Sequence, residues 1–347
     1  MIRIGIIGIG FMGYTHFEGA SELTGGRVTA IATRDPKKLA GDWTGIQGNF
    51  GPPGGQVDVS ELKCYSDYRE LIADPDIDLI DVCLPTDRHC DVVLECLRAG
   101  KPTLVEKPIA VSLDEATQMV QVAEEHNVPL LVAHVLPYFP EFQFAAEAVH
   151  SQKYGRLLAG HFKRVICPPD WSSGMSDFRK LGGWGIDLHI HDNHFVAHLC
   201  GTPDAVFSRG LLQDELVNHV HTSYVYNDGP AITSVSGGIA AKGQAFGHGF
   251  ELYFENATLA FEAGTYGGEW VVNRPLCLLT SEGTVEQVEL QGSDKWYAAF
   301  GAELQMAVDH LVSGAAPGPL SSELALNALR ICYAEARSIA DGTLVSL

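Results

Sequence analysis

One acid and three histidines recur at helical spacing in the middle of the chain. Asp187, His191, His194 and His198 follow at intervals of four, three and four residues, which would place them on one face of a helix. Such a polar stripe is costly to bury without partners, so we expect it to line a cleft or an interface. Because imidazole titrates near neutral pH, His191 is a candidate general base that Asp187 could orient. A satisfied core histidine is the competing interpretation.

A glycine-rich motif lies near the start of the chain. Residues 8–13 read Gly-Ile-Gly-Phe-Met-Gly and follow an apolar run at 4–7, the strand-then-helix context that a dinucleotide-binding GxGxxG requires. Its glycines would permit a tight turn, the approach of a pyrophosphate and close helix–strand packing, with the phosphates on the N–H groups of the helix start. The motif predicts NAD(P) as cofactor. The contacts expected from it are Gly8, Gly10, Phe11, Met12 and Gly13.

The end of the second expected strand bears on the choice between NAD and NADP. An NAD site usually has an acid there, about 20 residues past the turn, to hold the ribose hydroxyls. Thr33 occupies that place and Arg34 follows, and a hydroxyl with a guanidinium suits a 2′-phosphate. A solvent-facing Arg34 is the alternative, and Asp35 keeps NAD open because a shift of one residue would restore the acid. NADP is therefore slightly favoured over NAD.

The elements that must position these residues can be read from the hydrophobic pattern. Over residues 1–130, short β-branched runs alternate with amphipathic stretches, which is typical of a parallel α/β sheet. A serine at 112 and a glutamate at 115 form a capping box that opens one of the helices. The expected strands are 2–7, 28–33, 79–83, 103–105 and 130–133, and the expected helices include 90–99 and 113–125.

The pattern changes in the second half of the chain. Runs at 157–166, 205–212, 219–226, 250–254 and 285–290 favour a mostly antiparallel sheet, and helical patterns at 297–312 and 322–339 close the chain. We therefore predict two domains. Residues 1–130 would bind NAD(P) in a doubly wound Rossmann sheet, and 131–347 would form an α+β domain for substrate binding and oligomerisation. Its last helix could pack back on the first domain, and its broad sheet suits a homodimer or homotetramer.

Bulk properties exclude some classes of partner. A formal net charge of −20 over 347 residues disfavours nucleic acid and anionic membranes, because a polyanion releases no counterions from phosphates. No stretch approaches the roughly 20 apolar residues of a spanning helix. The eight cysteines contain no CxxC pair, which predicts reduced thiols in a cytoplasmic protein.

Residues 41–60 are rich in glycine and proline, a composition that resists regular structure. We expect a long surface loop there. It is either merely tolerated or folds over the adenosine end of the cofactor.

Two further motifs complete the pattern. Glu106-Lys107-Pro108 follows the expected strand at 103–105, and Asp187 precedes His191 by four residues behind a glycine-rich lead at 182–185. With the glycine turn, they strongly resemble the glucose–fructose oxidoreductase / inositol dehydrogenase family (Gfo/Idh/MocA), and the likeness runs nearly end to end. The resemblance implies a Rossmann domain followed by a domain built on a large open sheet.

The resemblance also implies roles. Lys107 and His191 would be catalytic with Asp187 alongside, and the Lys107–Pro108 bond can be cis. At the end of a parallel strand, the Lys107 ammonium would lie near the nicotinamide and could hydrogen-bond the reacting oxygen, while His191 takes the hydroxyl proton. Further cofactor contacts are expected at Leu84, Pro85, Thr86, His89, Glu106 and Lys107.

Other candidates follow from their expected places. His134 and Tyr138 flank the domain junction, Arg164 lies on the first strand of the second domain, and Trp171 could stack on a sugar. With His194 they are candidate substrate contacts, and ordinary packing is the alternative for each. His16 is expected in the first turn of the phosphate-binding helix, and His89 could equally cap its helix.

The chain departs from the family pattern at three places. Thr86 stands where Asn is frequent, Pro137–Pro140 replaces a region that often carries Arg, and His194 replaces an acid three residues after His191. These departures bear on the substrate contacts more than on the fold.

Three other functions compete with an NAD(P)-dependent oxidoreductase acting on a secondary alcohol or ketone of a sugar, polyol or cyclitol. The run from His189 to His194 superficially resembles a zinc-hydrolase signature, but its aspartate comes one position early and no second ligand cluster is evident, so no metal is expected. A glycoside hydrolase that uses NAD transiently and a non-catalytic dinucleotide-binding sensor remain open. The substrate, the direction and the oligomer are not specified by the sequence.

Overall fold

A computed structural model describes residues 1–48, 50–168 and 178–347. Its contacts divide the chain into two compact units, Met1–Tyr138 with Gly292–Leu326, and Phe139–Gln291 with Asn327–Leu347. The expected division put all of residues 131–347 into one second domain, whereas in the structure residues 131–138 and 292–326 belong to the first unit. Residues 292–326 cluster with the first unit, because the helix they contain packs on the helix that follows the glycine turn.

The first unit is built on a six-stranded parallel sheet. Its strand order is β3-β2-β1-β4-β5-β6, that of the doubly wound dinucleotide-binding fold. The prediction of this fold class is confirmed, although β3, a short strand without an apolar run, is missing from the sequence prediction. The strands are β1 (Ile2–Ile7), β2 (Gly26–Ala32), β3 (Lys63–Tyr65), β4 (Leu79–Val82), β5 (Thr103–Glu106) and β6 (Leu130–Ala133).

Helices and short 3₁₀ turns connect these strands. The Ser112 hydroxyl accepts a hydrogen bond from the Glu115 N–H at the start of α5, as its capping box predicts, and α5 ends at Asn127 in a left-handed conformation. The helices are α1 (Phe11–Gly19), α2 (Pro36–Leu39), α3 (Tyr68–Ala73), α4 (His89–Arg98), α5 (Leu113–His126) and α9 (Ala298–Ser313), with 3₁₀ turns at Ala20–Glu22, Thr86–Arg88, Leu136–Tyr138 and Gly318–Leu320.

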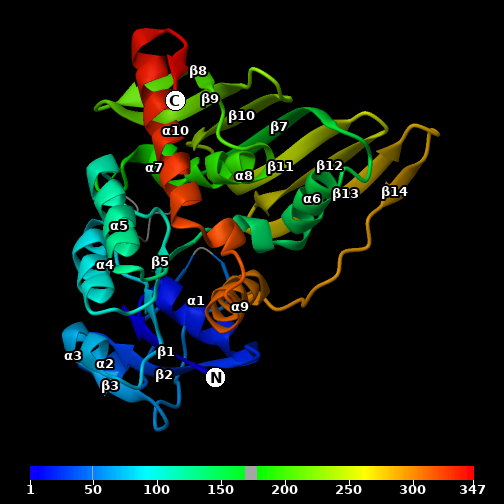
Figure 1. Cartoon of the computed structure of the whole chain (residues 1–347). Coiled ribbons are helices and arrows are strands. Elements are labelled where there is room, and N and C mark those ends of the chain that lie inside the picture. Colours follow the sequence, from blue (N-terminus) through cyan, green and yellow to red (C-terminus); the bar gives the residue numbers. More distant parts are fainter. Residues whose placement is uncertain (49, 169–177) are drawn as a thin grey trace. The chain divides into compact units, whose positions relative to one another are not determined.

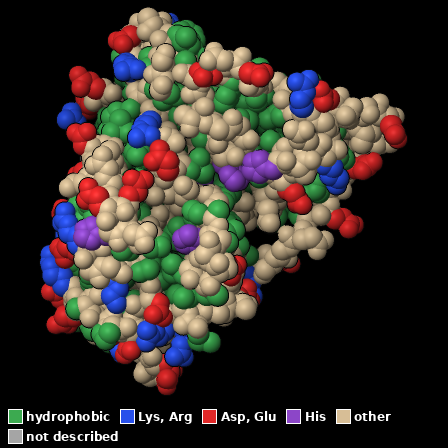
Figure 2. Space-filling model, in the orientation of Figure 1, with side chains coloured by type: hydrophobic (Ala, Val, Ile, Leu, Met, Phe, Trp, Pro, Cys, Tyr) green, Lys and Arg blue, Asp and Glu red, His purple; other side chains and the backbone are tan. Residues whose placement is uncertain are grey.

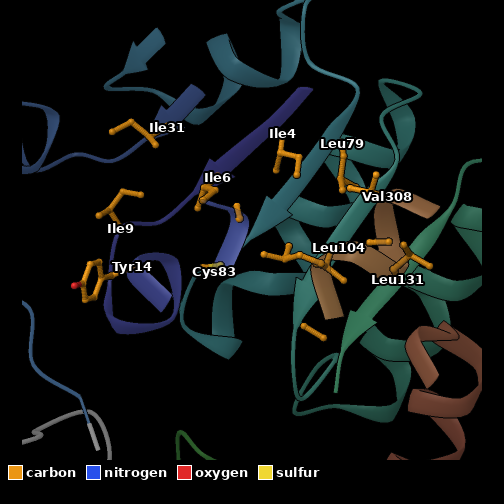
Figure 3. Close-up of a cluster of buried hydrophobic side chains, with 14 of the residues drawn as sticks. Ile4, Ile6, Ile9, Tyr14, Ile31, Leu79, Cys83, Leu104, Leu131 and Val308 are labelled. Carbon is orange, nitrogen blue, oxygen red and sulfur yellow. The ribbon is translucent and has the colours of Figure 1, made fainter. Parts of the chain in front are cut away.

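Helix α9, far along the chain, lies beside α1 (Figure 1). The two helices approach closely at Gly19 and Gly301, since a Cβ on Gly19 would lie 2.9 Å from the Gly301 nitrogen. Figure 3 shows the core of this unit, in which Ile4, Leu79 and Leu104 from the strands lie with Val308 of α9. Replacing one such leucine by alanine typically costs 2–5 kcal/mol of stability.

The second unit is built on a nine-stranded mixed sheet. Its order is β14-β13-β12-β11-β7-β10-β9-β8-β15, and the pairing of β7 with β10 is parallel while the neighbouring pairings are antiparallel. The expected mostly antiparallel sheet is confirmed. The strands are β7 (Leu157–Ile166), β8 (Ala205–Gln213), β9 (Leu216–Val225), β10 (Ala231–Gly238), β11 (Gln244–Phe254), β12 (Ala257–Tyr266), β13 (Glu269–Thr280), β14 (Val285–Gln287) and β15 (Val345–Ser346).

One face of this sheet is covered by helices α6 (Pro140–Ser151), α7 (Gly183–Asp187) and α8 (Ile190–Cys200) (Figure 1). Phe142 of α6 packs edge-on against Phe195 of α8 and Phe250 of β11. The later part of α10 (Ser322–Asp341) also joins this layer, because the Ser338 hydroxyl accepts the N–H of Ser208 on β8. Within the described ranges, no helix is long and apolar enough to cross a membrane.

The single helix expected from residue 187 to 199 is interrupted. Helix α7 ends at Asp187 and α8 begins at Ile190. The His191 N–H bonds to the Leu188 carbonyl instead of to the residue four before it. The polar stripe is therefore carried by the end of one helix and the start of the next.

Candidate active site

The glycine turn has the geometry that each of its glycines predicts. Gly8 has φ +98°, and a Cβ there would lie 2.7 Å from the Cys83 carbonyl oxygen, while one on Gly13 would lie 2.0 Å from the Gly8 oxygen. At Gly10, by contrast, an added Cβ meets nothing within 4 Å. Gly10 is also the N-cap of α1 and offers no side-chain cap to its first N–H groups. An anion can therefore approach the N-terminus of α1 at Gly10.

The end of β2 is arranged in a way that disfavours an acid at the ribose. Asp35 is the N-cap of α2, where its Oδ1 accepts the Lys37 N–H at 2.9 Å, and its own N–H donates to the Thr33 hydroxyl. Lys38 reaches back and donates to the Ile9 carbonyl in the glycine turn at 2.6 Å. The ammonium of Lys38 therefore lies next to the predicted phosphate turn, while Arg34 is exposed just after β2.

The segment 41–60 is anchored to the same region. Trp43 is fully buried, and its ring packs edge-on against Phe17 of α1 at 4.9 Å. Farther along, Phe50 packs edge-on against Phe11 at 4.7 Å and stacks on Phe300 of α9. The segment is therefore not a loop that is merely tolerated, because its aromatic side chains form part of the packing around α1.

The loops that follow β4 and β5 are tied together by His89. Its Nδ1 lies 3.0 Å from the Pro108 carbonyl oxygen and its Nε2 2.8 Å from that of Leu84. Burial lowers the pKa of this imidazole, whereas the two carbonyl oxygens favour its protonated form. Because both ring nitrogens are engaged inside the fold, His89 holds the two loops together, and a contact of His89 with the cofactor stays a prediction. Pro85 and Thr86, by contrast, are not buried.

Lys107 follows directly on β5, at the carboxyl edge of the parallel sheet. The Lys107–Pro108 bond is cis, and the Lys107 N–H donates to Oε2 of Glu106 at 3.0 Å. Lys107 is half-buried, whereas Glu106 is buried and points into the unit. Glu106 therefore directs its carboxylate into the interior instead of to the expected cofactor.

His134, on the segment after β6, is also fully buried, and burial raises the pKa of the nearby Tyr138 phenol.

In the second unit, Asp187 and His191 are half-buried. His194 is fully buried, and His198 packs edge-on against His150 at 4.9 Å. Burial, and then the neighbouring His150, lower the pKa of His198 to about 4. Of the predicted stripe, Asp187, His191 and His198 are thus partly exposed, whereas His194 is buried and its role as a substrate contact stays a prediction.

Arg164, an expected substrate contact, is engaged inside the second unit. Arg164 forms a two-point ion pair with Asp192, with Nε–Oδ2 and Nη2–Oδ1 both at 3.0 Å. Both side chains are almost completely buried, at 5% and 2% exposure. The sequence shows a polar residue on β7, but it does not show that Asp192 of α8 is the ion-pair partner of this residue. Trp171, the other candidate of this unit, lies outside the described residues.

A buried network that the sequence reasoning missed holds α8 to α10. His189 lies 3.0 Å from Glu335, and the same carboxylate accepts bonds from Asn193 and Thr222. Although burial lowers it, the pKa of His189 is raised to about 9 by Glu335 and by Asp192. The zinc-like run at 189–194 is thus explained by packing. The sequence carried one signal of it, an acid at Glu335 that follows the apolar residues Ile331 and Cys332 at helical spacing.

Comparisons with known proteins address the same features. Residues 2–134 match the oxidoreductase family with an NAD-binding Rossmann fold. Myo-inositol 2-dehydrogenase of Thermotoga maritima is 27% identical over 62% of this chain and 60% of its own length. The 2,7-anhydro-N-acetylneuraminate hydratase of Escherichia coli K12 is 22% identical over 76% of this chain and 60% of its own length. The matches span less than two thirds of the length of the curated relatives.

A solved structure resembles the chain over nearly its whole length. An oxidoreductase from Agrobacterium radiobacter, in complex with NAD+, L-tartaric acid and magnesium, superposes with a TM-score of 0.77 over 99% of this chain and 98% of that one, at 21% identity. At this identity the likeness establishes the fold of both units.

Proposed function

We propose that this chain, whose residues 2–134 match the oxidoreductase family with an NAD-binding Rossmann fold, transfers hydride between a nicotinamide and a secondary alcohol or ketone of a sugar, polyol or cyclitol. The observation that carries the proposal is the position of Lys107, a half-buried lysine at the carboxyl end of β5 in a sheet whose glycine turn accommodates an anion at Gly10. Ligands of open α/β sheets bind at this edge.

The residues of the first unit fit a dinucleotide. The open approach at Gly10 and the uncapped start of α1 suit the pyrophosphate, and Gly8, Phe11, Met12 and Gly13 shape that turn. The loop after β4, which contains Leu84, Pro85 and Thr86, lies at the same sheet edge. When bound, the nicotinamide supplies the acceptor or donor of hydride.

The protein's own groups would handle the proton and the charge. Oxidation of an alcohol removes a hydride from carbon and a proton from oxygen, and His191 of the second unit would accept that proton. The ammonium of Lys107 would donate a hydrogen bond to the same oxygen and stabilise its developing negative charge. Asp187, one turn before His191, would orient the imidazole or a neighbouring substrate hydroxyl. In the reductive direction His191 returns the proton.

We propose NADP as the preferred cofactor. Asp35 is occupied as the cap of α2, so the acid that would hold the ribose hydroxyls of NAD is absent from that role. Lys38 contacts the Ile9 carbonyl in the glycine turn, and Arg34 is exposed just after β2, so these two side chains would bind a 2′-phosphate.

The relative from Escherichia coli supports a second candidate. A hydratase adds water without net oxidation or reduction, and the match to that protein extends over 76% of this chain. A reaction of this kind, or hydrolysis of a glycoside by transient oxidation, would release product without accumulating reduced cofactor. A sensor would bind the nucleotide and turn over nothing.

The test is to titrate the protein with NADPH and NADH and then follow nicotinamide absorbance across a panel of polyols, aldoses and cyclitols, with Lys107→Ala as the control. Tight binding with a turnover that disappears in Lys107→Ala is expected. Binding without absorbance change, but with product release from an anhydro-sugar or glycoside, would favour the second candidate.

We also propose assembly and location. The sheet of the second unit carries exposed apolar side chains, such as Phe207 on β8 and Tyr253 on β11, which a homodimer or homotetramer would cover. On the visible face of the first unit, basic and acidic side chains are interspersed (Figure 2), which agrees with a small-molecule substrate and not with a nucleic acid. All eight cysteines are free, as expected in the reducing cytoplasm.

A further inference from the structure

A group of ionisable side chains lies buried beneath the glycine turn, within the first unit. His16 projects inward from the second turn of α1, one turn later than the sequence suggested, and is fully buried. Around it lie Asp81 of β4, Cys83 at the end of β4 and Glu106 of β5. Figure 3 places Cys83 at this end of the sheet. The proposed chemistry uses none of these side chains.

Both nitrogens of His16 face a carboxylate. Nδ1 lies 2.9 Å from Oδ2 of Asp81, and Nε2 lies 3.0 Å from Oε1 of Glu106. Nδ1 is in hydrogen-bond geometry with Asp81, whereas Nε2 meets Glu106 at ion-pair distance without hydrogen-bond geometry. The protonated ring is the form that is attracted to both carboxylates. Burial disfavours this charge, but Asp81 and Cys83 together raise the pKa of His16 well above its ordinary value. His16 is therefore a buried imidazolium between two strands.

Two more groups complete its surroundings. The Cys83 sulfur lies 3.5 Å from His16 Nδ1, and burial raises the pKa of this thiol. Glu303 of α9 lies 3.8 Å from His16 Nε2, is fully buried, and has its pKa raised well above its ordinary value by burial. The charged form of Glu303 is thus disfavoured, and the His16 imidazolium is the cation that faces Asp81 and Glu106.

The network continues from His16 to Lys107. Glu106 faces His16 through Oε1 and accepts the Lys107 N–H through Oε2 at 3.0 Å. Since both oxygens of this carboxylate have partners, its orientation is fixed from two sides. A rotation of Glu106 would release the peptide from which the Lys107 side chain projects. A rigid path thus runs from the phosphate-binding helix to this lysine.

The same atoms could be considered as metal ligands, because His16 Nδ1, an Asp81 oxygen and Cys83 Sγ lie within 4.8 Å of one another. Their separations of 2.9 and 3.5 Å are those of direct hydrogen bonds. Both imidazole nitrogens already have carboxylate partners, and a metal would have to replace the proton on Nδ1. The geometry favours a hydrogen-bonded ion cluster.

We propose that His16 is a positioning residue for Lys107. The His16 imidazolium holds Glu106, and Glu106 holds the Lys107 peptide, so that α1 sets the direction of the lysine ammonium. This inference rests on the proposed function in assigning chemistry to Lys107. It adds that a residue outside the reacting groups controls the rate, since a misplacement of about 1 Å can cost about 10²-fold in rate.

The first test compares His16→Gln, Glu106→Gln and the double variant. Each single variant is expected to lower kcat about 10- to 100-fold, while KM and the Kd for NADPH change by less than about threefold. The double variant should be no slower than the slower single variant, because both remove the same contact. Losses that multiply in the double variant, or an unchanged kcat, would overturn the proposal.

A matched variant separates positioning from loss of stability. Val120→Ala removes core volume from α5, in the same unit but away from the cluster, and should lower Tm without lowering kcat. If Val120→Ala reduces kcat as much as His16→Gln does, the role of His16 is only structural and the proposal is wrong. Stoichiometric zinc in the purified protein that disappears in His16→Gln would also overturn it, in favour of a metal site.

A second measurement does not depend on turnover. The lysines are methylated with ¹³C-formaldehyde, and the Lys107 dimethylamino signal is assigned by its disappearance in Lys107→Arg. We expect His16→Gln to change its chemical shift and its titration midpoint, and Val120→Ala to leave both unchanged. If the wild type turns over no compound but this signal still moves, the proposed function fails while the positioning role stands. If the signal does not respond to His16→Gln, the positioning role fails.

Discussion

Arg164 on β7 and Asp192 on α8 form a two-point ion pair that is almost entirely withdrawn from solvent, with two N–O distances of 3.0 Å. The pair joins the helix that begins just before His191 to the central strand of the sheet. Removing either residue is strongly destabilising, because the other is then left as an uncompensated buried charge.

Removal of one partner should therefore be more damaging than removal of both. Arg164→Met is expected to lower the free energy of unfolding by about 3–5 kcal/mol, and Arg164→Met combined with Asp192→Leu by clearly less. Urea denaturation of the two variants checks this. If the double variant is as unstable as the single one, the ion pair is not what links helix and sheet.

The protonation of His189 should make stability fall at alkaline pH. Its pKa is raised from 6.5 to about 9 in the folded chain. A raised pKa contributes stability that is fully present below about pH 6.5 and is lost as the pH rises through about 9, on the order of 3 kcal/mol in all. Urea denaturation between pH 6 and pH 10 should show this loss in the wild type, and a smaller one in His189→Asn. Parallel curves for the two proteins would contradict the assignment.

Cofactor choice should depend on the basic residues after β2. Lys38→Ala and Arg34→Ala are expected to raise the Kd for NADPH about tenfold or more, since each removes a charge-assisted contact to a 2′-phosphate, and to leave the Kd for NADH nearly unchanged. Lys37→Ala, an exposed neighbour, is the control. Equal losses for both nucleotides would mean that these side chains contact the pyrophosphate or nothing, and the NADP preference would fall.

The segment 41–60 should act as part of the fold. Trp43→Ala is expected to cost about 3–5 kcal/mol of stability, because it empties a fully buried site against α1. Trp270→Ala, at an exposed indole on β13, should change stability by less than about 0.5 kcal/mol. Chemical denaturation measures both. A loss below about 1 kcal/mol in Trp43→Ala would show that the segment is not anchored.

Much of the first unit could be predicted because its signals are local. The glycine turn, the β-branched strands and the capping box at Ser112 each depend on neighbouring residues, and the structure confirms the resulting parallel sheet. The alternating pattern after residue 155 likewise predicted an antiparallel sheet. The short strand β3 was missed, because three residues without an apolar run carry too little signal.

Side-chain partners were harder to predict, because they join distant parts of the chain. No residue close to Arg164 in the sequence indicates that Asp192 is its ion-pair partner. Likewise, no residue close to His16 indicates its contact with Glu106, which is 90 residues away. Spacing alone also treated 187–198 as one helix, whereas the chain breaks it at Leu188 and His189 and turns His189 inward to Glu335. A polar residue at helical spacing indicates a face, but tertiary packing decides whether that face is a site or a buried network.

Hydride transfer by this protein should depend on Lys107, which a comparison of NADPH binding and substrate turnover in the wild type and in Lys107→Ala would test. We predict a Kd for NADPH that differs by less than about threefold between the two proteins, and a kcat at least about 10²-fold lower in Lys107→Ala on whichever polyol, aldose or cyclitol the wild type accepts. Equal turnover by both proteins, or no binding of either nucleotide by the wild type, would show that the proposed function is wrong.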